Sequence, residues 1–150
     1  MIIQKNDIKI REMVIEDYHL LIKLFEEIPG IVVRDADSKE KTKIYLDRNP
    51  GLSFVAENES KIIGCVMAGH DGRRGYLQHL LVLPEHRNSG IATNLVNNSI
   101  NALKKCGILK THLFVLKDNN IGNDFWKSRD WQFREDVNMF SFTNSDNKNI

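Results

Sequence analysis

The sequence has few cysteines, little net charge and no long apolar run, and each of these absences argues against a class of protein. It has only two cysteines, Cys65 and Cys106, in 150 residues, which argues against a disulfide framework or a cysteine-based metal site. Its 21 basic and 20 acidic residues leave a net charge of +1, so no excess charge indicates a nucleic-acid or membrane-surface partner. No apolar run is long enough to cross a bilayer, and the N-terminus does not resemble a signal peptide. We therefore expect a cytoplasmic protein without metal, nucleic-acid or membrane partners.

What is present is typical of one globular α/β domain. The length predicts a single domain over residues 1–150, with 143–150 as a frayed tail. Periodicity and turn residues predict strands at Ile8–Glu12, Leu52–Glu57, Lys61–Ala68, Tyr76–Leu83, Thr111–Leu116, Trp131–Arg134 and Val137–Phe142. Helices are expected at Ile15–Glu27, from an Asp37 N-cap with Glu40 in a capping box to Asn49, from the Gly90 turn to Lys105, and at Asn119–Arg129. This order predicts a mixed sheet in an α/β or α+β domain.

The most informative stretch joins the apolar strand Tyr76–Leu83 to the helix that follows Gly90. The strand is closed by Pro84, and the connection reads Arg87-Asn88-Ser89-Gly90-Ile91-Ala92. A small turn that opens a helix presents backbone N–H groups beside the positive end of the helix dipole, which suits a phosphate or pyrophosphate. The plainer alternative is that Gly90 serves only to make the turn.

The spacing from Val82 to Ala92, Val-x-Pro-x-x-Arg-x-x-Gly-x-Ala, resembles the acetyl-CoA-binding signature of the Gcn5-related N-acetyltransferase (GNAT) family. The resemblance implies a small single-domain member with a mixed, mostly antiparallel sheet, about four flanking helices, and a splayed parallel strand pair that holds acetyl-CoA. It also implies transfer of the acetyl group to a primary amine of a small molecule or a protein, by a monomer or homodimer. The cofactor contacts that it implies in this stretch are Leu81, Val82, Leu83, Arg87, Asn88, Ser89, Gly90, Ile91 and Ala92.

A second resemblance covers residues 119–131, where the family pattern is Asn-x-x-Ala-x-x-Phe-Tyr-x-x-x-Gly-Phe. Asn119, Phe125 and the aromatic Trp131 fit this pattern, and Trp126 stands where relatives often carry a tyrosine. The resemblance places Asn119, Phe125 and Trp126 at the cofactor. In relatives the tyrosine is often the general acid that protonates the departing thiolate. An indole N–H cannot give up its proton at neutral pH but can donate a hydrogen bond to sulfur.

The residue that removes a proton from the amine is left open by the sequence. His79 is a candidate base because imidazole exchanges protons near neutral pH. The alternatives are a structural role for His79, a base among other nearby groups, namely Gln78, Tyr76 and the His70-Asp71 turn, or a water relayed through the central strand. His86 is read as a solvent or nucleotide contact and His112 as structural. Arg73 and Arg74 are either a charged hairpin tip or a grip for an acidic substrate group.

Two rival classes remain. One is a CoA-binding regulatory module with weak catalysis, suggested by Trp126, and the other is a domain that binds a different phosphorylated ligand at residues 87–92. A Walker loop and a Rossmann fingerprint are both absent from the sequence. Neither Cys65 nor Cys106 is placed to serve as an acyl carrier, so we expect direct transfer without an acyl-enzyme.

Overall fold

A computed structural model describes residues 7–150, and its chain forms two compact units. The first unit runs to His112 and contains the whole sheet, while the second comprises Leu113–Ile150. The expectation of one acetyltransferase domain over residues 1–150 stays a prediction.

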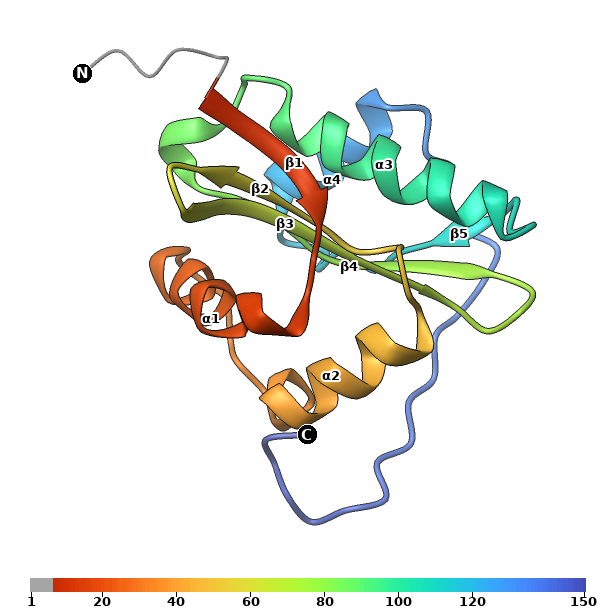
Figure 1. The fold of residues 1–150 in the computed structure, drawn as a ribbon. Coiled ribbons are helices and arrows are strands. Elements are labelled where there is room, and N and C mark those ends of the chain that lie inside the picture. The colour runs from red at the N-terminus through yellow and green to blue at the C-terminus, as the bar shows by residue number, and fades with distance from the viewer. Residues whose placement is uncertain (1–6) are drawn as a thin grey trace. The chain divides into compact units, whose positions relative to one another are not determined.

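The sheet has five strands in the order β1-β2-β3-β4-β5 (Figure 1). They are β1 (Ile8–Glu12), β2 (Phe54–Asn58), β3 (Lys61–His70), β4 (Gly75–Val82) and β5 (Thr111–His112). The first four pair antiparallel, and β5 alone runs parallel to its neighbour, β4. The predicted mixed, mostly antiparallel sheet is therefore confirmed.

Helices cover both faces of this sheet. They are α1 (Tyr18–Glu27), α2 (Lys39–Arg48) and α3 (Ile91–Lys105). A further helix, α4 (Asn120–Ser128), belongs to the second unit. Figure 1 shows α1 and α2 on one face and α3 on the other. Each of α1 and α3 turns one apolar stripe inward at helical spacing, as Leu21, Leu24 and Phe25 do in α1. Because β3 is covered on both sides, its residues 62–69 are all buried.

Two of the three 3₁₀ turns shift the beginning of a helix from its predicted residue. The helix expected from Ile15 starts at Tyr18, because Ile15–Asp17 forms a 3₁₀ turn in which the Asp17 carboxylate accepts the Val14 N–H and pairs with Arg11. A second 3₁₀ turn, η3, spans Asp35–Asp37. A third, η4, spans Pro84–His86.

The predicted Asp37 N-cap is wrong. The cap of α2 is Ser38, whose Oγ accepts the Lys41 N–H at 3.2 Å. The Asp37 carboxylate instead accepts the Arg34 N–H within η3, which moves the start of α2 one residue along the chain.

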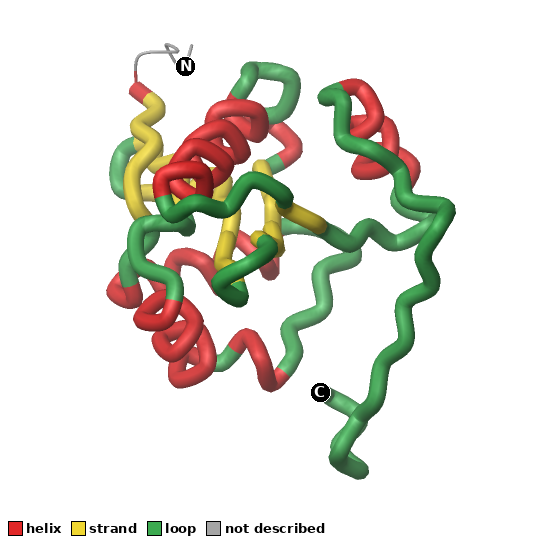
Figure 2. Tube along the Cα trace, turned by 90° about the vertical axis from the view of Figure 1, so that its right-hand side faces the viewer, coloured by secondary structure: helices red, strands yellow, loops and turns green. Residues whose placement is uncertain are grey.

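The strands predicted at Trp131–Arg134 and Val137–Phe142 are also wrong. Within residues 113–150, all of which are described, the structure has one helix and no strand (Figure 2). Similarly, β5 is limited to Thr111 and His112 instead of reaching Leu116. Alternating apolar residues favour a strand only where a partner supplies the ladder hydrogen bonds, and these segments have no such ladder.

Candidate functional site

Strand β4 carries an irregularity at its centre. Cys65 of β3 lies opposite Leu81, and Met67 lies opposite Gln78, so the single residue Val66 faces both His79 and Leu80. His79 has a left-handed backbone with φ of +49°. An extra residue of this kind is a β-bulge, which bends the strand and re-aims a side chain.

The side chain of His79 points to the face of the sheet covered by α1. Its ring stacks on Phe25 of α1 with centroids 5.1 Å apart, and its Nε2 lies 2.9 Å from Oδ1 of Asp37 in η3. Both side chains are largely buried, with exposed fractions of 26% for His79 and 14% for Asp37. The facing direction of His79, which alternation along the strand left open, is thereby settled.

Asp37 is itself held from three sides. Its Oδ1 faces His79, its Oδ2 accepts the Arg34 N–H at 2.8 Å, and its backbone carbonyl accepts a hydrogen bond from the Tyr18 hydroxyl at 2.9 Å. These contacts join α1, η3 and β4. Sequence reasoning missed this role for Asp37, because nothing in the local pattern links two residues 42 positions apart.

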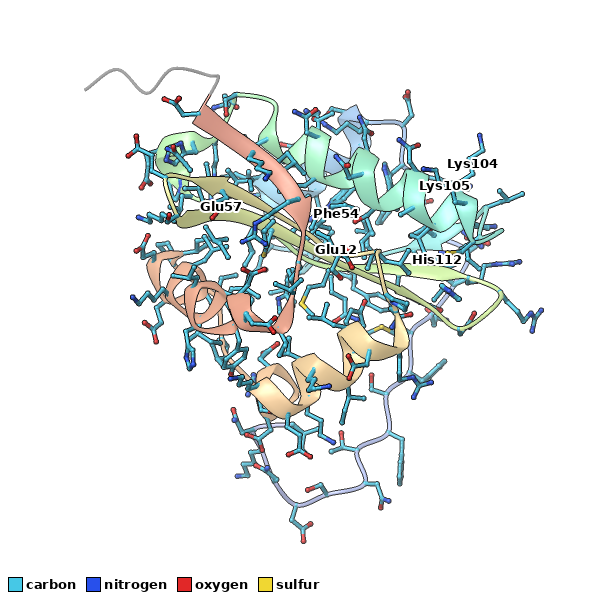
Figure 3. All side chains as sticks on the ribbon, in the orientation of Figure 1. Glu12, Phe54, Glu57, Lys104, Lys105 and His112 are labelled. Atoms are coloured by element: carbon cyan, nitrogen blue, oxygen red, sulfur yellow. The ribbon has the colours of Figure 1, made fainter. Side chains whose placement is uncertain are left out.

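The second half of β4 presents an edge that β5 does not cover. The parallel ladder pairs only Gly75 with Thr111 and Tyr76 with His112, and the rings of Tyr76 and His112 lie 5.8 Å apart. Figure 3 labels His112 on β5. At the far end the Leu83 N–H is bonded to the Ile63 carbonyl of β3. Because successive peptide groups point to opposite edges of a strand, Val82 directs its N–H and carbonyl away from β3.

The connection from β4 to α3 continues along this edge. Arg87 donates from Nε to the Val82 carbonyl at 3.1 Å, and the Ser89 hydroxyl donates to the His86 carbonyl. Asn88 and Gly90 both have left-handed backbones, with φ of +60° and +85°. Gly90 is the N-cap of α3, and its carbonyl accepts the Asn94 N–H.

The first turn of α3 therefore begins directly after a compact turn, as the sequence predicted. Ile91 is buried beneath this turn, whereas Ala92 is only half-buried. The N–H groups of a first helical turn have no partners within their own helix, and the helix dipole adds positive potential there. The part of the β4 edge that β5 does not pair and the N-terminus of α3 are thus consecutive along the chain, and both belong to the first unit.

The remaining predicted residues lie in the second unit. The Asn119 side chain caps α4 by accepting the Gly122 N–H at 2.9 Å. A Cβ on residue 122 would meet that side chain at 2.7 Å, which explains glycine there. The Trp126 ring packs edge-on against Phe125 and Trp131, with centroids 5.0 and 4.7 Å away.

The polar groups of the β3–β4 turn are engaged locally. The backbone N–H groups of Arg74 and Arg73 donate to the Asp71 carboxylate, which holds the pKa of Asp71 below its usual value. His70 accepts the Gly72 N–H at its Nδ1. These contacts stabilise the turn. For Arg73 and Arg74, a charged hairpin tip and a grip for an acidic substrate group both stay predictions.

The two cysteines differ in environment. Cys65 is fully buried in β3, and this burial raises the pKa of its thiol to about 12. Cys106 is exposed at the C-terminal end of α3, which is the end of the helix opposite Gly90. Within residues 7–150 the structure brings together no group of three metal-ligating side chains, and none of the helices there is long and apolar enough to cross a membrane.

Comparisons with known proteins agree with this geometry. Residues 18–131 match the acetyltransferase (GNAT) family. An acetyltransferase from Pectobacterium atrosepticum is 34% identical over 105 residues, which are 70% of this chain and 74% of that protein. An acetyltransferase from Sodalis glossinidius is 32% identical over 61% of this chain, and the match spans 65% of the relative.

Solved structures show the same fold. The PaiA N-acetyltransferase from Thermoplasma acidophilum, crystallised with coenzyme A, superposes with a TM-score of 0.71 at 27% identity and covers 81% of this chain and 87% of its own. An aminoglycoside acetyltransferase from a soil metagenome, in complex with sisomicin, gives 0.73 at 24% identity over 93% of this chain and 98% of its own. This chain belongs to the GNAT family of acyl-CoA-dependent acetyltransferases.

Proposed function

We propose that this protein transfers the acetyl group of acetyl-CoA directly to a primary amine of a small molecule or of a protein. The observation that carries the proposal is the part of the β4 edge that β5 does not pair, which leads into the N-terminus of α3. Family membership and the coenzyme A bound by the PaiA relative support the choice of donor.

In this proposal the donor contacts follow the chain from β4 into α3. The backbone of Leu81–Leu83 takes the pantetheine arm, and the outward N–H of Val82 is the main donor because that of Leu83 is bonded to Ile63. The N–H groups of residues 88–92 take the pyrophosphate. Arg87 adds positive charge while its Nε stays on the Val82 carbonyl.

The family pattern over residues 119–131 assigns Asn119, Phe125 and Trp126 to acetyl-CoA as well. Within the second unit, Asn119 caps α4, and the ring of Trp126 packs against those of Phe125 and Trp131. Trp126 offers its indole N–H to the sulfur but no transferable proton. A thiolate is a good leaving group, so the reaction does not depend on an acid at this position.

Direct attack by the amine is favoured over an acyl-enzyme. The Cys65 thiol is buried with a pKa of about 12, so almost none of it is present as the nucleophilic thiolate at neutral pH. Cys106 lies at the C-terminal end of α3, whereas the proposed pyrophosphate site is at its N-terminal end. His79 is the proposed base, because its ring lies beside a carboxylate on a strand whose edge takes the donor.

The proposal is tested in two steps. Thermal shift with acetyl-CoA, CoA, ATP and NAD identifies the ligand class, and stabilisation by acetyl-CoA and CoA but not by NAD is expected. Thiol release is then followed with polyamines, aminoglycosides, arylalkylamines and peptides bearing free amines. Binding without thiol release from any of these amines would favour the regulatory module, and stabilisation by ATP alone would contradict the proposal.

A further inference from the structure

We propose that Asp37 is a positioning residue that fixes the ring of His79 so that Nδ1 is the atom that takes the proton from the amine. This inference rests on the proposed acetyl transfer and deepens it. The sequence already indicated His79 as a candidate base. Its partner Asp37 in η3 is seen only in the structure.

The contact between Asp37 and His79 determines which nitrogen of the imidazole carries the hydrogen. An ionised carboxylate only accepts hydrogen bonds, so the imidazole nitrogen that lies 2.9 Å from Asp37 Oδ1 must carry the hydrogen. Nε2 is therefore the protonated nitrogen in the neutral ring. The lone pair is left on Nδ1, for which the structure gives no hydrogen-bond partner among residues 7–150.

Both Asp37 and His79 are held in place by further contacts. Oδ2 of Asp37 is bonded to the Arg34 N–H, and the Tyr18 hydroxyl anchors the Asp37 carbonyl. On the other side, Phe25 stacks on the ring of His79 at 5.1 Å. A side chain with these fixed contacts has few other rotamers available, so the direction of Nδ1 is set before any substrate binds.

His79 also has an unusual backbone. Its left-handed conformation is uncommon for residues other than glycine and is strained. The bulge that produces it directs the ring to α1 and η3. With the ring in this direction, Nε2 of His79 reaches Oδ1 of Asp37. Backbone strain of this kind concentrates at functional sites.

The proton balance is simple. The amine arrives as an ammonium and gives one proton to Nδ1, while the Asp37 carboxylate stabilises the resulting imidazolium. The neutral nitrogen attacks the acetyl carbonyl, a C–N bond forms and the C–S bond breaks. The second proton leaves nitrogen and ends on the departing thiolate, which gives an amide and CoA thiol. His79 then returns its proton to water.

The main test is a double-mutant cycle with Asp37→Asn, His79→Gln and the combination. Glutamine keeps a side-chain N–H that can reach Asp37 but has no basic nitrogen. Thiol release is measured with spermine, sisomicin and a lysine peptide as acceptors. We expect kcat to fall about 10²–10⁴-fold in His79→Gln and about 10–100-fold in Asp37→Asn, with the KM for acetyl-CoA unchanged.

The cycle decides whether Asp37 acts through His79. In the His79→Gln background, Asp37→Asn is expected to have no further effect on kcat. An equal loss in both backgrounds, or no loss in either, would overturn the proposal. Asp37→Glu, which keeps the carboxylate, is expected to retain more activity than Asp37→Asn, and Asp35→Asn in the same turn controls for loss of negative charge.

A second measurement does not depend on turnover or on the acceptor. The ¹⁵N NMR signals of the His79 ring in the wild-type protein are expected to show a protonated Nε2 and an unprotonated Nδ1 in the neutral form, and Asp37→Asn to lose this preference. A neutral ring protonated at Nδ1, or an unchanged tautomer in Asp37→Asn, would refute the positioning role. Absence of thiol release in the wild-type protein would instead count against the proposed function.

Discussion

Gly90 offers a direct test of the proposed pyrophosphate site. It has a φ of +85°, and an added Cβ would have no heavy atom within 4 Å. Replacing Gly90 with valine therefore causes no clash in the free protein, and its cost is backbone strain of about 1–3 kcal/mol. For a chain of this size, each kcal/mol lowers the melting temperature by about 2–4 °C.

Gly90→Val should also weaken the binding of acetyl-CoA, which backbone strain alone does not explain. The branched side chain occupies the space in front of the first turn of α3, where the pyrophosphate is proposed to accept backbone hydrogen bonds. Losing one hydrogen bond to a charged group costs about 1.5–3 kcal/mol, which corresponds to a roughly 10- to 100-fold higher Kd for acetyl-CoA.

The chain contains a matched control. Gly107 follows the C-terminal end of the same helix with a φ of +82°, and an added Cβ there also meets no atom within 4 Å. Gly107→Val should lose similar stability but bind acetyl-CoA normally. Calorimetric titration of both variants provides the comparison. Equal affinities in the two variants would refute the assignment of the pyrophosphate to this turn.

Three further outcomes follow from the same assignment. Val82→Pro removes the outward N–H of β4 and should abolish acetyl-CoA binding in calorimetry; normal binding by a folded variant would show that the pantetheine lies elsewhere. Trp126→Tyr should keep or raise kcat and Trp126→Phe should lose less than about 10-fold, because the thiolate leaves unaided; a loss near 10³-fold in Trp126→Phe would assign the indole an essential role. A thiol reagent at pH 8 should modify Cys106 alone in the native protein and both cysteines after denaturation, and a variant lacking both should turn over normally; an acetylated Cys65 or Cys106 that passes its acetyl group to an amine would contradict direct transfer.

Local chemistry explains what could be predicted from the sequence. The turn from Arg87 to Ala92 and the helix after it depend on a glycine with positive φ and on apolar spacing, which are properties of neighbouring residues. The hairpin of β2 and β3 follows from two apolar runs separated by a short polar turn, and the parallel pairing of β4 with β5 follows from the helical crossover between them. The fold class and the family could therefore be predicted from the sequence.

Contacts between distant segments decided the rest. The N-cap moved from Asp37 to Ser38 because the Asp37 carboxylate is used by Arg34 and His79, one of them 42 residues away. Alternation at Val137–Phe142 predicted a strand, but a strand also needs a partner, and no pairing forms there. The bulge at His79 depends on how β4 registers against β3, which no local pattern encodes. The sequence alone thus determined the proposed donor site in β4 and α3, because that site is built from one continuous stretch. The tertiary structure determined the partner of His79, because that contact joins segments whose approach depends on the whole fold.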